Sequence, residues 1–133
     1  MEKVVIASAA RTPVGSFQGS LSQLAAPKLG AIAIKEALQR AQLKPDEVQE
    51  CIMGEVLTAG VGQAPSRQAA IYAGLSTATQ CLTINKVCGS GLKAVMLAAD
   101  SIALGHIQIA VAGGQESMTL APHLLENSRS GYR

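Results

Sequence analysis

The stretch "NKVCGSGLKAV", residues 85–95, places one cysteine between two segments of different periodicity. The preceding "QCLTIN", residues 80–85, is short and apolar, as in a buried strand. The following "GSGLKAVMLAADSIAL", residues 89–104, is long enough for a helix. Cys88 therefore falls just past a strand, at the start of a helix, with glycines at 89 and 91. Ligands of open α/β sheets gather at the carboxyl ends of strands.

The same alternation extends in both directions from Cys88. Strand patterns occur at residues 4–10, 50–57, 80–85 and 107–114, and helix patterns at residues 27–42, 65–74 and 89–104. The order βαβαβαβ predicts right-handed crossovers and a mostly parallel sheet. The fold class is therefore α/β.

The helix predicted at 89–104 is apolar nearly all round, because Lys93 and Asp100 are its only charged residues. Such a helix is expected to be buried. One face can lie on the sheet, but something else must cover the other, and this chain has little left to do so. After Gly114 the pattern stops, and "QESMTLAPHLLENSRSGYR" has no clear period.

Composition excludes several classes of protein. A chain of 133 residues can bury one core, and 48% of its residues are hydrophobic. Only Phe17, Tyr72 and Tyr132 are aromatic, so the core needs close backbone packing. A net charge of +2 without basic clusters argues against nucleic acid. No uninterrupted apolar stretch reaches the roughly 18 residues of a membrane span, so no membrane association is expected.

The start of the chain, "MEKVVIASAARTP", allows two interpretations. An early lysine, a short apolar run and small residues resemble a secretory signal. The positively charged region is minimal, however, and the apolar run is short. We therefore predict that residues 4–10 form the first buried strand.

The chain has three cysteines, an odd number at irregular spacing: Cys51, Cys81 and Cys88. They form no disulfide framework, and without a CxxC pair no metal site is expected. A reducing cytoplasm is the simplest compartment. Cys51 and Cys81 lie within strand patterns and are expected in the core.

Cys88 has a chemical and a structural interpretation. The N–H groups and positive dipole end of a helix N-terminus favour a thiolate and can hold a developing oxyanion. Gly89 and Gly91 would leave room for an incoming acyl group, so Cys88 could be a nucleophile that forms a thioester. Free cysteine is also among the most buried residue types. The local residues alone leave both interpretations open.

Four stretches resemble the thiolase family, in the family's order and at compatible spacing. "NKVCGSGLKAVMLAA" resembles its nucleophile segment, and "SAARTPVGSF" (8–17), "GQAPSRQAA" (62–70) and "AGGQESMTLAP" (112–122) resemble three others. The likeness covers essentially the whole chain and is strongest to the biosynthetic, acetyl-CoA acetyltransferase branch. Gln115 departs from the Met common in the family, and Ala64 and Ser66 depart from the usual Asn and Ala.

The resemblance implies acyl transfer between coenzyme A thioesters. Thiolases join two acetyl-CoA molecules into acetoacetyl-CoA plus CoA, or run the reverse thiolysis. Cys88 would carry the acyl group, and its backbone N–H would contribute to an oxyanion hole. Acetyl-CoA and CoA would be substrates, with no permanently bound cofactor. The alternative within the family is a degradative 3-ketoacyl-CoA thiolase.

The resemblance also implies an organisation. A layered thiolase fold would place the first part of an N-terminal domain at residues 1–118 and the start of a loop domain, which supplies most CoA contacts, at 119–133. The family's activating His, second catalytic Cys and Asn-Glu-Ala-Phe segment lie later in its chains, so the remainder of a thiolase chain is an expected partner. Homodimers or tetramers are expected, with the 80–85 strands paired across a two-fold axis.

The remaining polar candidates are weaker. We expect His106 to be solvated in a turn, and nothing makes His123 a base. Glu116 could be a catalytic carboxylate, but a structural hydrogen-bond acceptor is preferred. The glycine-rich "TAGVGQ" (58–63) could cradle phosphate, yet it lacks the P-loop lysine. Arg67 and Gln68 could bond across this loop or lie on a surface helix.

Two other classes of function stay open at this point. One is a cysteine hydrolase that uses Cys88 with His123. The other is a non-catalytic dimerisation module built on the same fold.

Overall fold

The computed structural model describes residues 3–132 and is a mixed α/β structure. Three of the four predicted strands and all three predicted helices are confirmed, with ends shifted by up to three residues. The elements, in chain order, are α1 (Ala26–Ala41), a short 3-10 helix η1 (Pro45–Glu47), β1 (Glu50–Gly54), α2 (Pro65–Ala73), β2 (Gln80–Ile84), α3 (Ser90–Ala103) and β3 (Ala110–Gly114).

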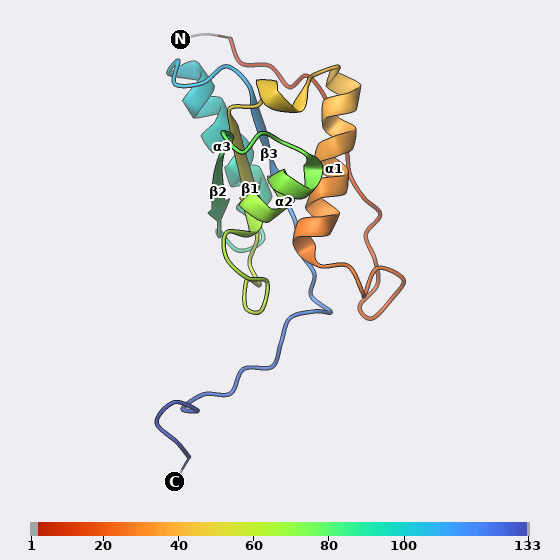
Figure 1. The fold of residues 1–133 in the computed structure, drawn as a ribbon, viewed down its shortest axis with the longest axis vertical. Coiled ribbons are helices and arrows are strands. Elements are labelled where there is room, and N and C mark those ends of the chain that lie inside the picture. The colour runs from red at the N-terminus through yellow and green to blue at the C-terminus, as the bar shows by residue number, and fades with distance from the viewer. Residues whose placement is uncertain (1–2, 133) are drawn as a thin grey trace.

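The three strands form one parallel sheet in the order β2-β1-β3. The connection from β1 to β2 and that from β2 to β3 run in opposite directions across the sheet. Right-handed crossovers therefore place α2 and α3 on opposite faces. Figure 1 shows α3 on one side of the strands, with α2 and α1 on the other. The predicted parallel sheet is confirmed for these strands.

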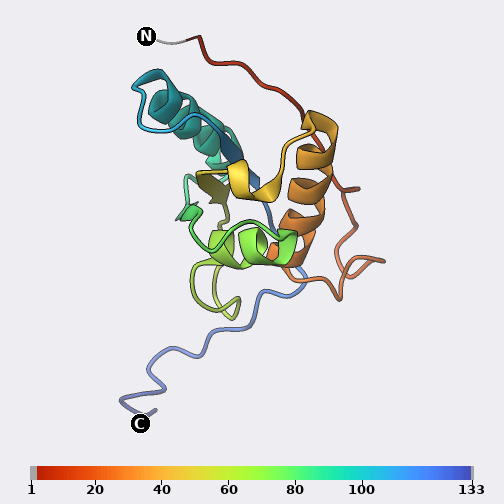
Figure 2. The same ribbon diagram turned by 45° about the horizontal axis from the view of Figure 1, so that its top comes forward.

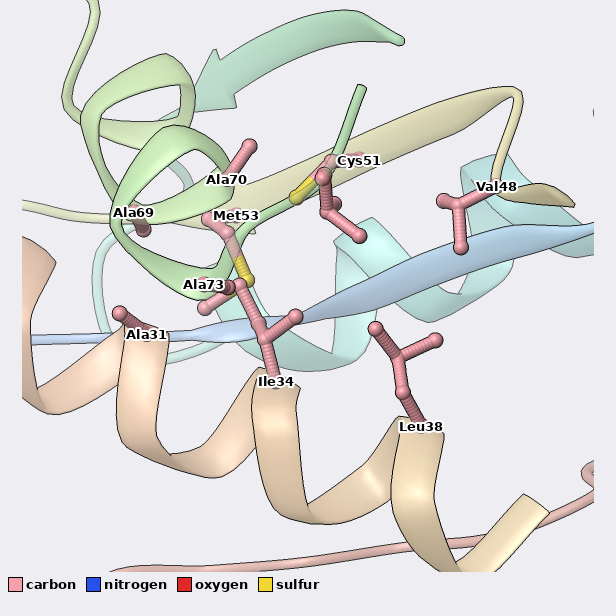
Figure 3. Packing of buried hydrophobic residues seen from close by; sticks show 10 residues of the cluster. Ala31, Ile34, Leu38, Val48, Cys51, Met53, Ala69, Ala70 and Ala73 are labelled. Carbon is pink, nitrogen blue, oxygen red and sulfur yellow. The ribbon is translucent and has the colours of Figure 1, made fainter. Parts of the chain in front are cut away.

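The core is divided into two clusters by the alternation of side chains along β1. Cys51 and Met53 face α1 and α2, whereas Ile52 faces α3. Small residues let the helices approach closely: Ala69, Ala70 and Ala73 of α2 join the first cluster and Ala94 and Ala98 of α3 the second. Figure 3 shows Ile34 and Leu38 of α1 pointing toward β1 and α2.

The predicted first strand at residues 4–10 is wrong for this chain. The segment is extended but forms no ladder with any strand. It runs past α1 instead, where the Ser8 hydroxyl donates to the Ala37 carbonyl at 2.6 Å and Arg40 donates to the Ala9 carbonyl at 2.8 Å (Figure 2). Val5 and Ile6 are 69% and 79% exposed. An apolar extended segment becomes a strand only when a sheet edge pairs with it.

The 89–104 helix is buried on its sheet-facing side only, as expected for a chain with little left to cover the other side. Ala94 and Ala98 are buried against the sheet, but Leu92 and Met96 are 71% and 50% exposed on the opposite side. The described residues after β3 do not fold back over this face. They contain no helix or strand and extend away from the body in Figure 1. The boundary at residues 118 and 119 stays a prediction.

The described part of the chain, residues 3–132, contains no helix long and apolar enough to cross a membrane.

Candidate active site

Cys88 lies in the short connection between the carboxyl end of β2 and the first residue of α3. Its side chain is exposed. The sequence placed it at this junction, and the structure confirms the placement. The Ser90 N–H donates to the Val87 carbonyl at 3.1 Å. The start of α3 also directs the positive end of the helix dipole toward this region.

The turn before Cys88 holds a strained residue in place. Val87 has a φ of 50°, in the left-handed region that β-branched residues rarely adopt. Such a conformation costs roughly 1–3 kcal/mol and persists only where its surroundings impose it. The Val87 N–H donates to Asn85 Oδ1 at 2.9 Å. The Ser90 hydroxyl accepts from the Lys86 N–H at 2.7 Å and donates to the Val87 carbonyl at 2.6 Å.

Two glycines at strand ends let the start of α3, which follows this turn, pack directly on the sheet. A Cβ on Gly54, the last residue of β1, would lie 2.5 Å from Ser90 Cβ and 2.8 Å from the Gly91 nitrogen. A Cβ on Gly114, the last residue of β3, would lie 3.3 Å from Gly91 Cα. The start of α3 therefore rests directly on the backbone of two strand ends. Sequence reasoning assigned Gly91 to substrate access and missed Gly54 and Gly114, although glycine at two strand ends was a readable signal.

A cavity of about 900 Å³ opens beside Cys88. Its walls come from the loop that precedes α1, the ends of β1 and β3, and the segment after β3. Among residues 3–132, Arg11 and Glu116 are the only charged residues in the lining, and no histidine lines it. His106 and His123 are both exposed. The described residues therefore form a mainly apolar cavity that contains the Cys88 thiol but no imidazole base.

Glu116 acts as a structural acceptor, as the sequence favoured. Its carboxylate accepts the Val56 N–H at 2.9 Å and the Leu57 N–H at 3.0 Å. These bonds hold the chain that leaves β1 against the chain that leaves β3. They fix one wall of the cavity.

A second carboxyl group, Glu55, was missed by sequence reasoning. It is only 1% exposed and accepts a hydrogen bond from Gln115 Nε2 at 2.7 Å. Burial is the main cause that raises the pKa of Glu55, and the nearby carboxylate of Glu116 raises that pKa further, whereas the bond from Gln115 lowers it. The sequence signal that could have identified Glu55 is its position directly after the buried strand "CIMG".

The glycine-rich loop at 58–63 is closed by α2. Gln68 Nε2 donates to the Val61 and Gln63 carbonyls at 3.0 and 2.8 Å. Arg67 instead donates to the Thr79 and Thr77 carbonyls at 2.8 and 2.9 Å, before β2. Of the two roles left open for Arg67 and Gln68, Gln68 bonds to this loop. Arg67 fastens α2 to the start of β2.

The three thiols differ in accessibility. Cys51 is buried, and this burial is the main reason that its pKa is raised to about 12. Cys81 is half-buried against the same cluster, and Cys88 is exposed. The expectation that Cys51 and Cys81 belong to the core is confirmed for Cys51 and holds in part for Cys81.

Comparison with known proteins decides the family. The model of the family described as "Thiolase, N-terminal domain" matches residues 4–133. The chain belongs to the thiolase family. This confirms the resemblance at the Cys88 segment and the three accompanying stretches.

Similar thiolases include bacterial and animal proteins. The acetyl-CoA acetyltransferase of Cupriavidus necator is 63% identical over 133 residues, which are 100% of this chain and 34% of that protein. The mitochondrial acetyl-CoA acetyltransferase of Homo sapiens is 52% identical over 132 residues, 99% of this chain and 31% of that protein. The chain thus spans about a third of the length of the curated relatives it matches.

A solved thiolase structure has the same fold. The Acat5 thiolase from Ascaris suum, solved in complex with coenzyme A, matches with a TM-score of 0.88 and 43% sequence identity. The match covers 91% of this chain and 32% of that one. The thiolase-like layered α/β architecture predicted from the sequence is therefore confirmed.

Gly54→Ala should disturb the seat of the Cys88 turn. The new methyl group has to displace Ser90 or the start of α3, and overpacking of this kind costs about 1–3 kcal/mol. Urea unfolding measures the loss. Gly91→Ala is the matched control, because its Cβ would lie 3.6 Å from Gly114 Cα, an ordinary contact. An equal loss in both variants would contradict the proposed seat.

Glu55 should make stability fall as the pH rises. Because its folded pKa lies above the ordinary 4.5, the native state holds this proton more tightly than the unfolded chain. The resulting stabilisation is complete below about pH 4.5 and is lost as the pH rises through the folded pKa. Urea unfolding between pH 4 and 8 should therefore show a smaller decline for Glu55→Gln, while the exposed Asp46→Asn behaves as wild type. Parallel curves for wild type and Glu55→Gln would refute this assignment.

Brief alkylation of the folded protein with iodoacetamide should modify Cys88 first, because it alone is exposed. Trypsin places each cysteine in its own peptide, at residues 41–67, 68–86 and 87–93. Mass spectrometry of these peptides gives the order of modification. Labelling of Cys51 before Cys88 in a folded sample would be inconsistent with the structure.

Proposed function

We propose that the protein carrying this chain transfers acyl groups between coenzyme A thioesters through a Cys88-bound intermediate. Its physiological reaction is the condensation of two acetyl-CoA molecules to acetoacetyl-CoA and CoA, or the reverse thiolysis. The observation that carries the proposal is the exposed Cys88 thiol, held on a strained turn at a helix N-terminus and open to the cavity. The names of the relatives and the coenzyme A complex of the Ascaris suum thiolase support this substrate class.

The first half of this reaction needs a nucleophile and a place for negative charge. The Cys88 thiolate attacks the thioester carbonyl, the new C–S bond forms, and CoA leaves as its thiolate. Donors at the start of α3, with the Cys88 N–H as the family resemblance implies, are placed to stabilise the oxyanion that develops during attack. The apolar cavity beside Cys88 offers room for the acyl group and the pantetheine arm.

The second half needs a base. Within residues 3–132 the cavity lining offers one carboxylate, Glu116, and both of its oxygens already accept backbone N–H groups. Carbon–carbon bond formation requires removal of a proton from the α-carbon of the second acetyl group. Neither histidine lines the cavity, and the buried Cys51 thiol favours its protonated form. We assign this step to the remainder of a full-length thiolase chain. The degradative 3-ketoacyl-CoA thiolase remains the alternative within the family.

The other classes receive less support. A cysteine hydrolase would pair Cys88 with His123, but His123 is exposed and does not line the cavity. A purely structural dimerisation module gives no reason for the strained turn that presents an exposed thiol.

The proposed assembly is a homodimer or tetramer joined through β2. This strand lies at the edge of the sheet, and Leu82 on it is 44% exposed. An unprotected edge with apolar side chains favours pairing with another strand. A second copy of the chain is the partner that the family resemblance implies.

We also propose a reducing compartment, with the cytoplasm as the first choice. All three cysteines are free, although Cys51 and Cys81 lie opposite each other on paired strands. Some relatives are named mitochondrial, and a reducing interior is common to both locations.

Residues 1–133 alone should not turn acetyl-CoA over. A lost general base costs about 10²–10⁴-fold in rate, and the expected result is at most one CoA released per Cys88. Free CoA and acetoacetyl-CoA, measured for the fragment and for the full-length protein, test this. Full-length wild type should produce acetoacetyl-CoA and its Cys88→Ser variant should not. Sustained production by the fragment, or by the Cys88→Ser variant, would refute the assignment.

Association should depend on the exposed edge of β2. Leu82→Lys places a charge where a second β2 strand would pack, and charged edge residues oppose pairing. Sedimentation equilibrium of the full-length protein should show a shift toward monomer in this variant. Ile32→Lys, at a 52% exposed position on α1, is the matched control for one added positive charge. A wild-type protein that is strictly monomeric would exclude this assembly.

A further inference from the structure

Two buried polar side chains, Glu55 and Gln115, bond to each other where β1 and β3 end. They are 1% and 7% exposed. Gln115 Nε2 donates to Glu55 Oε2 at 2.7 Å and to the Pro65 carbonyl at 3.3 Å. The second oxygen of each side chain, Oε1 in both cases, has no partner among the described residues. Burying such groups is unfavourable, so stability alone is a poor reason for the pair.

The pair lies directly beyond the last aligned residues of the two strands, Gly54 and Gly114. The Gln115 N–H donates to the Gly54 carbonyl at 2.9 Å, and the Glu55 N–H donates to the Ile84 carbonyl at 3.0 Å. Successive side chains of a strand point to opposite faces. Gly54 faces the start of α3, so Glu55 and Gln115 lie on the other face of the sheet, beneath the glycines that seat the Cys88 turn.

Helix α1 accommodates this pair. A Cβ at Gly30, inside α1, would collide with Gln115 Oε1. Glycine in a helix interior is destabilising relative to alanine. Gln115 therefore contacts three elements. It meets the end of β1 through Glu55, helix α1 through Gly30 and the start of α2 through Pro65.

We propose that Glu55 and Gln115 are positioning residues for Cys88. Their hydrogen bond sets the separation of the β1 and β3 ends, and that separation fixes where the start of α3 and the Cys88 turn rest. The role in acyl transfer rests on the function proposed above. Because a Gln115→Met substitution leaves Glu55 Oε2 without its partner, it should be harmful while Glu55 is present.

The test compares Gln115→Met, Glu55→Leu and the double variant in the full-length protein. Acetylation of Cys88 by acetyl-CoA is followed as CoA release, and alkylation of Cys88 by iodoacetamide is measured separately. Each single variant should slow both reactions about tenfold, since small displacements of a reacting group are costly. The double variant should be no slower than the singles, because the two residues act as a unit.

Stability separates positioning from general damage. Replacing both partners by apolar groups removes the unpaired buried carboxyl, so the double variant should unfold at a higher urea concentration than Gln115→Met and yet remain slow. Glu55→Gln keeps an acceptor for Gln115 and should react within about twofold of wild type. Thr79→Val is the matched control, because it removes a buried bond to the Val48 carbonyl at the opposite end of the sheet. It should lower stability without slowing Cys88.

Two outcomes would overturn the proposal. One is a loss of rate in the single variants no greater than that in Thr79→Val. The other is recovery of both rate and stability in the double variant. If wild type releases no CoA while the alkylation rates follow the expected order, the positioning role stands and the proposed acyl transfer fails.

Discussion

The structure depends on a backbone contact between the start of α3 and the ends of two strands. Gly54 and Gly114 end neighbouring parallel strands, and Ser90 and Gly91 rest on them with no room for a side chain at Gly54. This contact determines how close α3 lies to the sheet. Ala94 and Ala98 continue it along the helix with small side chains. A composition rich in alanine and glycine is what such packing requires.

The position of Cys88 follows from this contact. Once the start of α3 is fixed at β1 and β3, the chain leaving β2 has only five residues, 85–89, to reach it. The left-handed Val87 makes the sharp turn, and Asn85 and Ser90 hold it through side-chain hydrogen bonds. Strain of this kind is typical of sites where geometry matters more than stability. The resulting thiol is exposed at the helix N-terminus, above the cavity.

The local structure around Cys88 was predictable because the hydrophobic periodicity of the sequence matches the packing of the same segments in the fold. The strand, turn and helix around Cys88 were predicted from their patterns, and so was the structural role of Glu116. Prediction failed where a segment depends on a partner that the local pattern does not encode. Residues 4–10 have the composition of a strand but pair with no edge within residues 3–132. The exposed Leu92 and Met96 on α3 were expected instead, because this chain has little left to cover that face. Glu55 was missed because its burial depends on Gln115, which is 60 residues away in the sequence.

The central claim is that this geometry makes Cys88 the residue that carries the acyl group. Peptide mapping of the full-length protein, quenched in acid during its reaction with acetyl-CoA, tests this directly. The account predicts one acetyl group on the peptide of residues 87–93, lost again when CoA is added. An acetyl group on residues 41–67 or 68–86, or turnover of acetyl-CoA with residues 87–93 unmodified, would contradict it.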